Sequence, residues 1–514
     1  MRFLDQPIEF AVLPGAVPAA CGEVNAGQLV SFCDALPDAG GRLVSLWGTD
    51  ERDRGRGFDL HAAFATREGL ACLRLPLPAD DPVFPDLSTR FPAAGRLQRA
   101  LHDMLGMRAE GGDARGWLRH ANWPADFFPL RRDADASRAF DPLSEPYAFV
   151  RVEGEGVHEI PVGPIHAGTI EPGHFRFSIV GEKVLRLEER FGYKHKGIAR
   201  LFRSLPLAEG YRLAGRVSGD STVAYAWAYC QAAESACGCE PPEQALWLRA
   251  LMLERERIAN HLGDLGAIAN DAAFSFGLAQ FMRLKEDWLR GNEAAFGHRY
   301  LMDRIVPGGV ACEPKPGAAD AIARQCDAIQ AEVRVLKDIY DEHAGLQDRF
   351  LTAGRLAPRL AAELGVTGLA GRASAQSWDL RVDIASPPYD RLEVNMVTHR
   401  NGDVAARVTV RFEEVFESLR LIREILARMP GGKARVALPQ AQEGAFGVGW
   451  IEGWRGPVLV ALEAGAAGAI RDCHCHDPSW QNWPALEHCI MGNIVPDFPL
   501  INKSFNLSYA GPDL

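Results

Sequence analysis

Apolar residues in the first 140 positions alternate with polar and turn-forming ones, a pattern typical of a mixed α/β unit. The apolar runs predict β-strands at residues 41–48, 58–64 and 70–77. A helix is predicted over residues 96–107, followed by a glycine-rich turn. Residues 137–146 are polar with proline and predict a linker. We therefore expect an N-terminal α/β domain over residues 1–140.

The clearest helical signal in the rest of the chain is residues 245–270, which are rich in Leu, Ala and Met. With a rotation of about 100° per residue, four polar side chains fall within one stripe of this helix. They are Glu254, Arg257, His261 and Asp264. The pattern predicts a helix with one charged stripe.

Length and composition limit the class of protein. A chain of 514 residues is too long for one core, and about three domains is the usual expectation. The net charge of −11 argues against nucleic acid as a partner. No uncharged apolar run approaches the roughly 18 residues of a membrane-spanning helix, and the first residues do not resemble a signal peptide. The 11 scattered cysteines favour reduced thiols in a cytoplasmic protein.

Two motifs carry a resemblance to the 30-kDa-type subunit of respiratory complex I. Residues 98–107 read Gln-Arg-Ala-Leu-His-Asp-Met-Leu-Gly-Met, similar to Glu-Arg-Glu-x-x-Asp-Leu-Phe-Gly-Ile in that family. Residues 128–133 read Phe-Pro-Leu-Arg-Arg-Asp, similar to its His-Pro-Leu-Arg-Lys-Asp. The domain is a scaffold without a redox group in that family, and the resemblance implies the same here.

From about Val150 onward, an ordered set of motifs resembles the large subunits of membrane-bound, complex-I-related [NiFe] hydrogenases. The matching segments are residues 163–166, 171–177, 192–198, 254–266, 307–310 and 403–411. The C-terminal residues 498–509 look like the tail of a hydrogenase-4-like subfamily that has given up nickel. The resemblance implies a mainly helical second domain over residues 141–514, with a small β subdomain near its start. The predicted fold class is therefore α+β multidomain.

The segments that bind nickel in those hydrogenases differ in this chain. Their Arg-x-Cys-Gly-x-Cys corresponds to Arg-Val-Ser-Gly-Asp-Ser at residues 216–221, and their Asp-Pro-Cys-x-x-Cys to Asp-Pro-Ser-Trp-Gln-Asn at residues 477–482. The four ligating cysteines thus fall on Ser218, Ser221, Ser479 and Asn482. Soft transition metals select thiolates, whereas a serine hydroxyl is harder and far less acidic. The resemblance therefore implies a nickel pocket whose ligands are lost.

Asp220 lies between two of these positions and has two interpretations. A carboxylate in a closed cavity would have a raised pKa and could exchange protons. Alternatively, Asp220 is the N-cap of the helix that follows. The cap is favoured because caps are common.

Other candidate side chains surround the former cavity. Glu254, Arg257 and His261 line it, or contact an iron–sulfur partner, or form a paired polar network that stabilises a buried helix. His166 and His174 flank a loop near the quinone site of complex I, or satisfy backbone groups in that loop. The quinone-binding histidine and tyrosine of complex I fall near Pro172 and on Gly219, so neither carries over.

The run Cys-His-Cys-His at residues 473–476 resembles a soft-metal site in composition. Successive residues of an extended segment point to opposite faces, so only one like pair can face one ion. A zinc site would need outside ligands such as His488 or Cys489. We expect no metal in this chain, with Cys473 and Cys475 as weak candidates. Neither this run nor Cys-Gly-Cys at residues 237–239 offers the cysteines of an iron–sulfur cluster.

The resemblance also implies partners and a location. They are a small subunit that carries an iron–sulfur cluster, antiporter-like and other membrane subunits, and a peripheral position on the cytoplasmic face of the inner membrane. No glycine-rich nucleotide motif is present, so any NAD would be bound by another subunit. We expect no cofactor on this chain, although the former metal cavity could hold a quinone.

Two functions follow. The chain is a subunit of an NADH:quinone oxidoreductase-like or hydrogenase-like complex that couples electron transfer to ion movement, or a non-catalytic scaffold of such a complex. An active [NiFe] hydrogenase is a third and weaker interpretation, because oxygen and amide donors do not suit nickel. An open apolar channel between the two motifs would favour a bound acceptor. A filled cavity would favour the scaffold.

Overall fold

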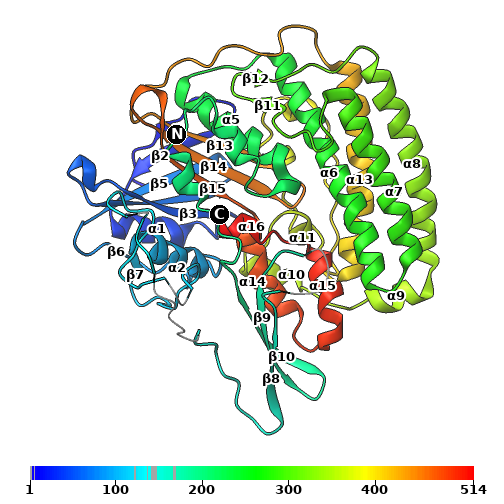
Figure 1. Ribbon diagram of the computed structural model, residues 1–514, viewed down its shortest axis with the longest axis horizontal. Helices are drawn as coiled ribbons and strands as arrows, with labels where there is room; N and C mark the ends of the chain where they lie inside the picture. Colours follow the sequence, from blue (N-terminus) through cyan, green and yellow to red (C-terminus); the bar gives the residue numbers. More distant parts are fainter. Residues whose placement is uncertain (1–2, 5, 121–122, 136, 141–146, 166–169) are drawn as a thin grey trace.

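The computed structural model describes residues 3–4, 6–120, 123–135, 137–140, 147–165 and 170–514. Its N-terminal part is a five-stranded sheet in the order β1-β2-β5-β4-β3 (Figure 1). Strands β2 and β5 are parallel, and the other neighbours are antiparallel. The strands are β1 (Ala11–Val12), β2 (Ala19–Glu23), β3 (Arg42–Asp50), β4 (Phe58–Thr66) and β5 (Gly69–Leu77). The three predicted strands are confirmed as β3, β4 and β5.

One face of this sheet is covered by helices α1 (Ala26–Ala35) and α2 (Ala94–Leu105), whose apolar side chains join the main core. The predicted helix over 96–107 is confirmed as α2, which ends at Gly106 in a left-handed conformation with φ of 78°. Helix α2 approaches β3 at Gly48, where a Cβ would lie 2.5 Å from the Met107 sulfur. The short elements nearby are η1 (Arg52–Arg54), β6 (Val83–Phe84) and β7 (Arg108–Ala109).

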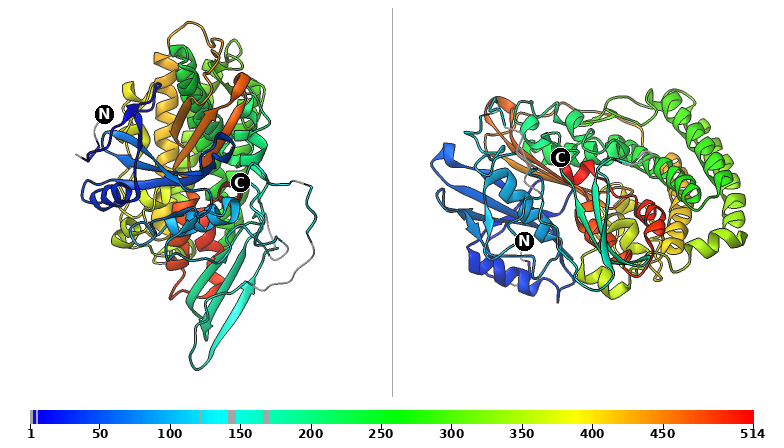
Figure 2. Two further views of the ribbon diagram at one scale, coloured as in Figure 1. Left: turned by 90° about the vertical axis from the view of Figure 1, so that its left-hand side faces the viewer. Right: turned by 60° about the horizontal axis from the view of Figure 1, so that its bottom comes forward.

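A three-stranded antiparallel sheet projects from the body of the molecule as a finger (Figure 2). It consists of β8 (Val157–Val162), β9 (His174–Val180) and β10 (Lys183–Arg190). This sheet is the small β subdomain expected near the start of the second domain. Of the predicted linker, residues 141–146 lie outside the described residues.

Long helices form the opposite side of the molecule (Figure 1). The predicted helix over 245–270 is confirmed as α6 (Glu243–Asp271), which packs against α7 (Ser275–Phe296) and α13 (Val404–Arg428). Helix α8 (Ala318–Glu342) completes this bundle. The shorter elements are α3 (Ile198–Phe202), α4 (Gly210–Ala214), η2 (Gly219–Ser221), β11 (Ile305–Val306), β12 (Gly309–Val310), α9 (Ala344–Phe350), α10 (Pro358–Glu363), α11 (Gly368–Arg372), α12 (Leu380–Asp383), η3 (Tyr389–Arg391), η4 (Ala466–Gly468), α14 (Ser479–Cys489), η5 (Val495–Asp497), α15 (Phe498–Phe505) and α16 (Ala510–Asp513).

A second three-stranded sheet lies between the N-terminal sheet and the helices, and the sequence did not predict it. It is formed by β13 (Phe446–Glu452), β14 (Pro457–Ala464) and β15 (Ile470–His476). One face shares a core with Val44, Trp47 and Ala63 of the N-terminal sheet. The other face packs on helix α5 (Thr222–Cys237). Strand β14 is buried on both faces, so its sequence lacks the alternation that marks a half-exposed strand.

Candidate functional site

The two motifs that align with the nickel-binding segments meet in the structure. Ser218 precedes η2 and helix α5, and Ser479 begins helix α14. The Ser218 hydroxyl lies 3.0 Å from the Ser508 hydroxyl, and the Ser508 amide donates to the Ser479 hydroxyl at 2.9 Å. Ser508, from the C-terminal segment, therefore joins the two motifs.

Arg455 lies beside the first motif and connects it to the C-terminal segment. Its guanidinium donates to Asp220 Oδ1 at 2.9 Å and to Ser221 Oγ at 3.3 Å, and it also contacts Asp220 Oδ2 and the Asn506 carbonyl. Ser218, Ser221, Ser479 and Asn482 are 6%, 4%, 0% and 1% exposed. Protein side chains with hydrogen-bond partners thus surround these four positions.

Asn482 pairs with the protein backbone. Its side-chain oxygen accepts from the Thr367 amide at 3.0 Å, and its side-chain nitrogen donates to the Thr367 carbonyl at 3.2 Å. Thr367 is the N-cap of α11. The amide therefore ties α14 to α11, which is a structural use of the position.

The contacts of Asp220 favour neither of its two sequence-based interpretations. Burial acts to raise the pKa of Asp220, but the Arg455 guanidinium outweighs it and the pKa is lowered to about 2. The side chain of Asp220 bonds to Arg455 and to the Ser218 hydroxyl, and it does not cap α5. The cap is Glu256, which accepts from the amides of Val223 at 2.6 Å and Ala224 at 3.2 Å. A cap supplied from a distant helix cannot be recognised from local spacing.

The polar stripe on α6 is buried and paired. Glu254 accepts from Arg257 at 3.3 Å, from Tyr389 at 2.7 Å and from Ser418 at 2.6 Å, and it also pairs with Arg381. Burial acts to raise the pKa of Glu254, but Arg381 and Arg257 outweigh it and the pKa is lowered. These contacts support the interpretation of the stripe as a stabilising network.

The same network continues through the other two members of the stripe. His261 Nε2 lies 2.8 Å from Glu414, which also accepts from Arg372 at 2.8 Å. Asp264 accepts from Arg411 at 2.9 Å and from Asn506 at 2.7 Å. Asn506 in turn contacts Arg455. The stripe is therefore linked by hydrogen bonds to Arg455, which contacts the first motif.

Of the two loop histidines, only His174 lies within the described residues. His166 lies outside the described residues. His174 begins β9, and its Nδ1 lies 3.1 Å from the Gly163 carbonyl oxygen. His174 also lines a cavity of about 580 Å³ with basic and aromatic side chains, including Arg119, Arg190, Trp123 and Tyr193.

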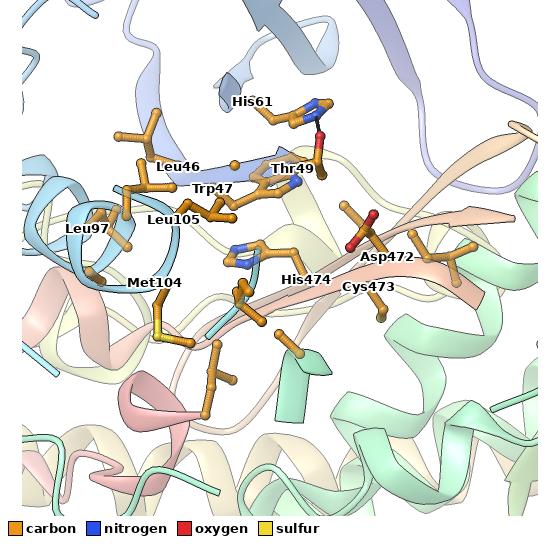
Figure 3. A pocket seen from close by; sticks show the side chains of 18 of the residues that line it. Leu46, Trp47, Thr49, His61, Leu97, Met104, Leu105, Asp472, Cys473 and His474 are labelled. Atoms are coloured by element: carbon orange, nitrogen blue, oxygen red, sulfur yellow. Dashed lines mark hydrogen bonds between the residues drawn. The ribbon is translucent and has the colours of Figure 1, made fainter. Parts of the chain in front are cut away.

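The Cys-His-Cys-His run forms most of β15, and its residues alternate between the two faces as predicted. The His474 ring stacks on Trp47 with centroids 4.9 Å apart and bonds to the Ser45 hydroxyl at 2.8 Å (Figure 3). Cys473 and Cys475 are buried in the main core. Among the residues that the structure describes, no three His, Cys, Asp or Glu side chains are grouped to hold a metal ion.

Three residues that contact these motifs, Arg455, Ser508 and Glu256, were not predicted from the sequence. Arg455 lies in a Trp-Arg-Gly-Pro turn before strand β14, and its only local signal is a charge between two apolar runs. Ser508 and Glu256 have no local signal of a role at these motifs, because their contacts depend on distant segments. The structure was needed to find all three.

Two family models match separate parts of the chain. Residues 23–139 match the family model of the respiratory-chain NADH dehydrogenase 30 Kd subunit, and residues 271–445 match that of the 49 Kd subunit. The chain is 30% identical to formate hydrogenlyase subunit 5 of Escherichia coli strain K12, over 92% of this chain and 85% of that protein. It is also 30% identical to hydrogenase-4 component G of that strain, over 92% and 84%.

Further matches extend the comparison. An NADH-quinone oxidoreductase subunit of Bacteroides thetaiotaomicron is 27% identical over 99% of both chains. A solved chain from the membrane-bound sulfane sulfur reductase, an archaeal respiratory membrane complex, has the same fold, with a TM-score of 0.66 and 22% identity over 70% of this chain and 99% of that chain. The protein belongs to the complex-I-related hydrogenase large-subunit family, with 30-kDa-type and 49-kDa-type sequences fused in one chain. No helix in the described part of the chain is both long and apolar enough to cross a membrane.

Proposed function

We propose that this protein is a non-catalytic core subunit of a membrane-associated, complex-I-like oxidoreductase complex, in which the former nickel pocket has become structural. The relatives that match most of the chain are named as hydrogenase and NADH-quinone oxidoreductase subunits, which supports membership of such a complex. The contacts of Arg455 with the first motif carry the structural part of the proposal.

The residues at the former metal positions do not fit nickel. Three hydroxyls and one amide replace four thiolates, and neither donor type suits a soft transition metal. The Arg455 guanidinium, which pairs with Asp220, donates to the Ser221 hydroxyl and so engages one of these oxygen donors. The donors are also engaged with protein partners. The buried, hydrogen-bonded pocket therefore favours the scaffold over an acceptor bound between the motifs.

The proposal includes the surroundings of the chain. The iron–sulfur cluster and any NAD site belong to other subunits, among them a small iron–sulfur subunit. Antiporter-like and other membrane subunits hold the chain at the cytoplasmic face of the inner membrane. In this arrangement the chain connects the redox subunits to the membrane subunits.

Metal analysis of the intact complex tests the proposal. The complex is purified from native membranes, its subunits are identified by mass spectrometry, and its nickel and iron are measured by plasma mass spectrometry. We expect iron from a partner subunit and nickel far below one atom per chain. A known [NiFe] hydrogenase, purified in the same way, is the positive control. One nickel per chain would contradict the proposal that the pocket is structural. Purification without membrane subunits would contradict the proposal that the chain belongs to a membrane-associated complex.

Quinone binding at a different place is a second candidate function. The cavity of about 580 Å³ beside His174 has the size of a small-molecule site, and its arginine and aromatic side chains suit a planar, polar headgroup. We expect His174→Ala to weaken binding of a short-chain quinone at least tenfold, as measured by quenching of tryptophan fluorescence in the complex. His158→Ala, at an exposed position on β8, is the control. If His174→Ala and His158→Ala bound the quinone with equal affinity, the cavity beside His174 would be excluded as the quinone site.

A further inference from the structure

Two cysteines face each other in the N-terminal sheet. Cys21 on β2 is the register partner of Cys72 on β5, and these strands are parallel. Register partners present their side chains on the same face, and neighbouring strands lie about 4.7–4.9 Å apart. A disulfide requires Cα atoms about 4.4–6.8 Å apart. The register therefore places the two Cα atoms within the range that a disulfide spans.

The surroundings of the pair distinguish its two thiols. Cys21 is partly exposed, Cys72 is buried, and both line a cavity of about 370 Å³ together with His61 and Phe446. The neighbouring Cys21 thiol raises the pKa of Cys72 well above its usual value, and burial adds to the effect. Cys21 is therefore the more accessible of the two thiols, and Cys72 lies beside it on the same face of the sheet.

A second close pair in the chain provides a contrast. Cys473 and Cys475 lie two residues apart on the same strand, which separates their Cα atoms by about 6.6–6.8 Å, at the limit for a disulfide. They are 5% and 1% exposed. Proximity along the sequence therefore does not favour a disulfide between Cys473 and Cys475. The register of β2 and β5 favours one between Cys21 and Cys72.

We propose that Cys21 and Cys72 form a reversible dithiol–disulfide site that takes a small-molecule disulfide as its oxidant. The Cys21 thiol loses its proton and attacks one sulfur of the oxidant, which releases one thiol and leaves a mixed disulfide. Cys72 then loses its proton and attacks the Cys21 sulfur, which releases the second thiol. The products are one Cys21–Cys72 disulfide and two reduced thiols, so two electrons and two protons pass to the oxidant.

A Cys21–Cys72 disulfide would lie at the interface between the N-terminal sheet and the sheet formed by β13, β14 and β15. Cys21 and Cys72 lie on the sheet face that packs against β13 and β14, in the core shared with Val448 and Trp450. Oxidation would join β2 covalently to β5 and fix the edge of the sheet beside this interface. The site therefore adds a redox-dependent constraint to the proposed scaffold, although its chemistry does not depend on that function.

Thiol mapping of the full-length chain tests the inference. The reduced protein is incubated with glutathione disulfide, its free thiols are blocked with a maleimide, and its peptides are identified by mass spectrometry. We expect the loss of two of the 11 thiols, a peptide crosslinked through Cys21 and Cys72, and full recovery with dithiothreitol. Cys473 and Cys475 should stay reduced.

Two serine variants separate the steps. In Cys72→Ser, Cys21 should stop at a stable mixed disulfide with glutathione, whereas Cys21→Ser should abolish the reaction at Cys72. Thiol mapping of the wild-type protein does not depend on either variant. Poor folding of a variant would therefore leave the main test unaffected. A persistent mixed disulfide on wild-type Cys21, or oxidation of Cys473 and Cys475 without the crosslink, would overturn the proposal.

Discussion

Glu256 shows how one buried side chain links stability to pH. Its carboxyl group caps α5, with its two oxygens accepting from the amides of Val223 and Ala224. Burial raises the pKa of Glu256 to about 8, and the two amide hydrogen bonds oppose this rise only in part. The folded protein therefore holds a proton on Glu256 at neutral pH, where the unfolded chain has lost it.

We predict that Glu256→Gln changes the pH dependence of stability. Because the folded pKa is raised from 4.5 to about 8, the stabilisation is complete below pH 4.5 and is lost as the pH rises to about 8. The unfolding free energy of the wild type, relative to the variant, should fall by at most about 1.4 kcal/mol per pH unit in this range. Urea unfolding at several pH values measures it. The control Glu182→Gln, at an exposed turn, should show the same pH profile of unfolding free energy as the wild type. If the profile of Glu256→Gln were parallel to that of the wild type, Glu256 would not link stability to pH.

At the scale of elements, helix α5 and strand β13 approach each other unusually closely. A Cβ on Gly449 would lie 1.8 Å from the Ala228 carbonyl oxygen, and one on Gly447 would lie 2.1 Å from the Ala232 carbonyl oxygen. Glycines on the strand and alanines one turn apart on the helix let the two backbones touch. This contact positions the start of α5, where the serine motif lies.

We predict that Gly449→Ala destabilises the protein by about 3 kcal/mol or more, because the backbone of α5 would have to move. Chemical denaturation followed by circular dichroism measures the loss. Gly431→Ala is the matched control, since an added Cβ there has no atom within 4 Å. Similar stabilities for the two variants would show that α5 and β13 are not packed as described.

At the scale of the whole molecule, ion pairs join the N-terminal part to the second sheet. Asp472 on β15 pairs with Arg132 and with Arg203, the latter at 2.7 Å, and its side chain is only 14% exposed. Arg471, the preceding residue, pairs with Glu51 at 3.1 Å and Asp53 at 2.7 Å. The two halves also share one apolar core. We therefore expect them to unfold as one unit.

We predict that Asp472→Ala lowers the unfolding free energy by about 2 kcal/mol, because two arginines would face each other without the carboxylate. Differential scanning calorimetry should show one transition at a lower temperature. Asp126→Ala, which removes a carboxylate that is 72% exposed, should change the free energy by less than about 1 kcal/mol. Two separate transitions in the wild type would contradict the shared core.

The sequence by itself determined the local elements and the family. Strands β3, β4 and β5 and helices α2 and α6 follow from periodicity, which depends only on neighbouring residues. The ordered motifs carried the resemblance to the family and the prediction that nickel ligands are lost at four positions. These properties are local, so they can be read without the fold.

Only the tertiary structure decided what surrounds those positions. Arg455 and Ser508 reach the serine motif from distant segments, and Glu256 supplies the cap that local spacing assigned to Asp220. Strand register likewise brought Cys21 opposite Cys72. Each of these contacts joins segments that are far apart in the chain, and the energy that selects it comes from burial and pairing in the folded core. No local pattern records such a contact.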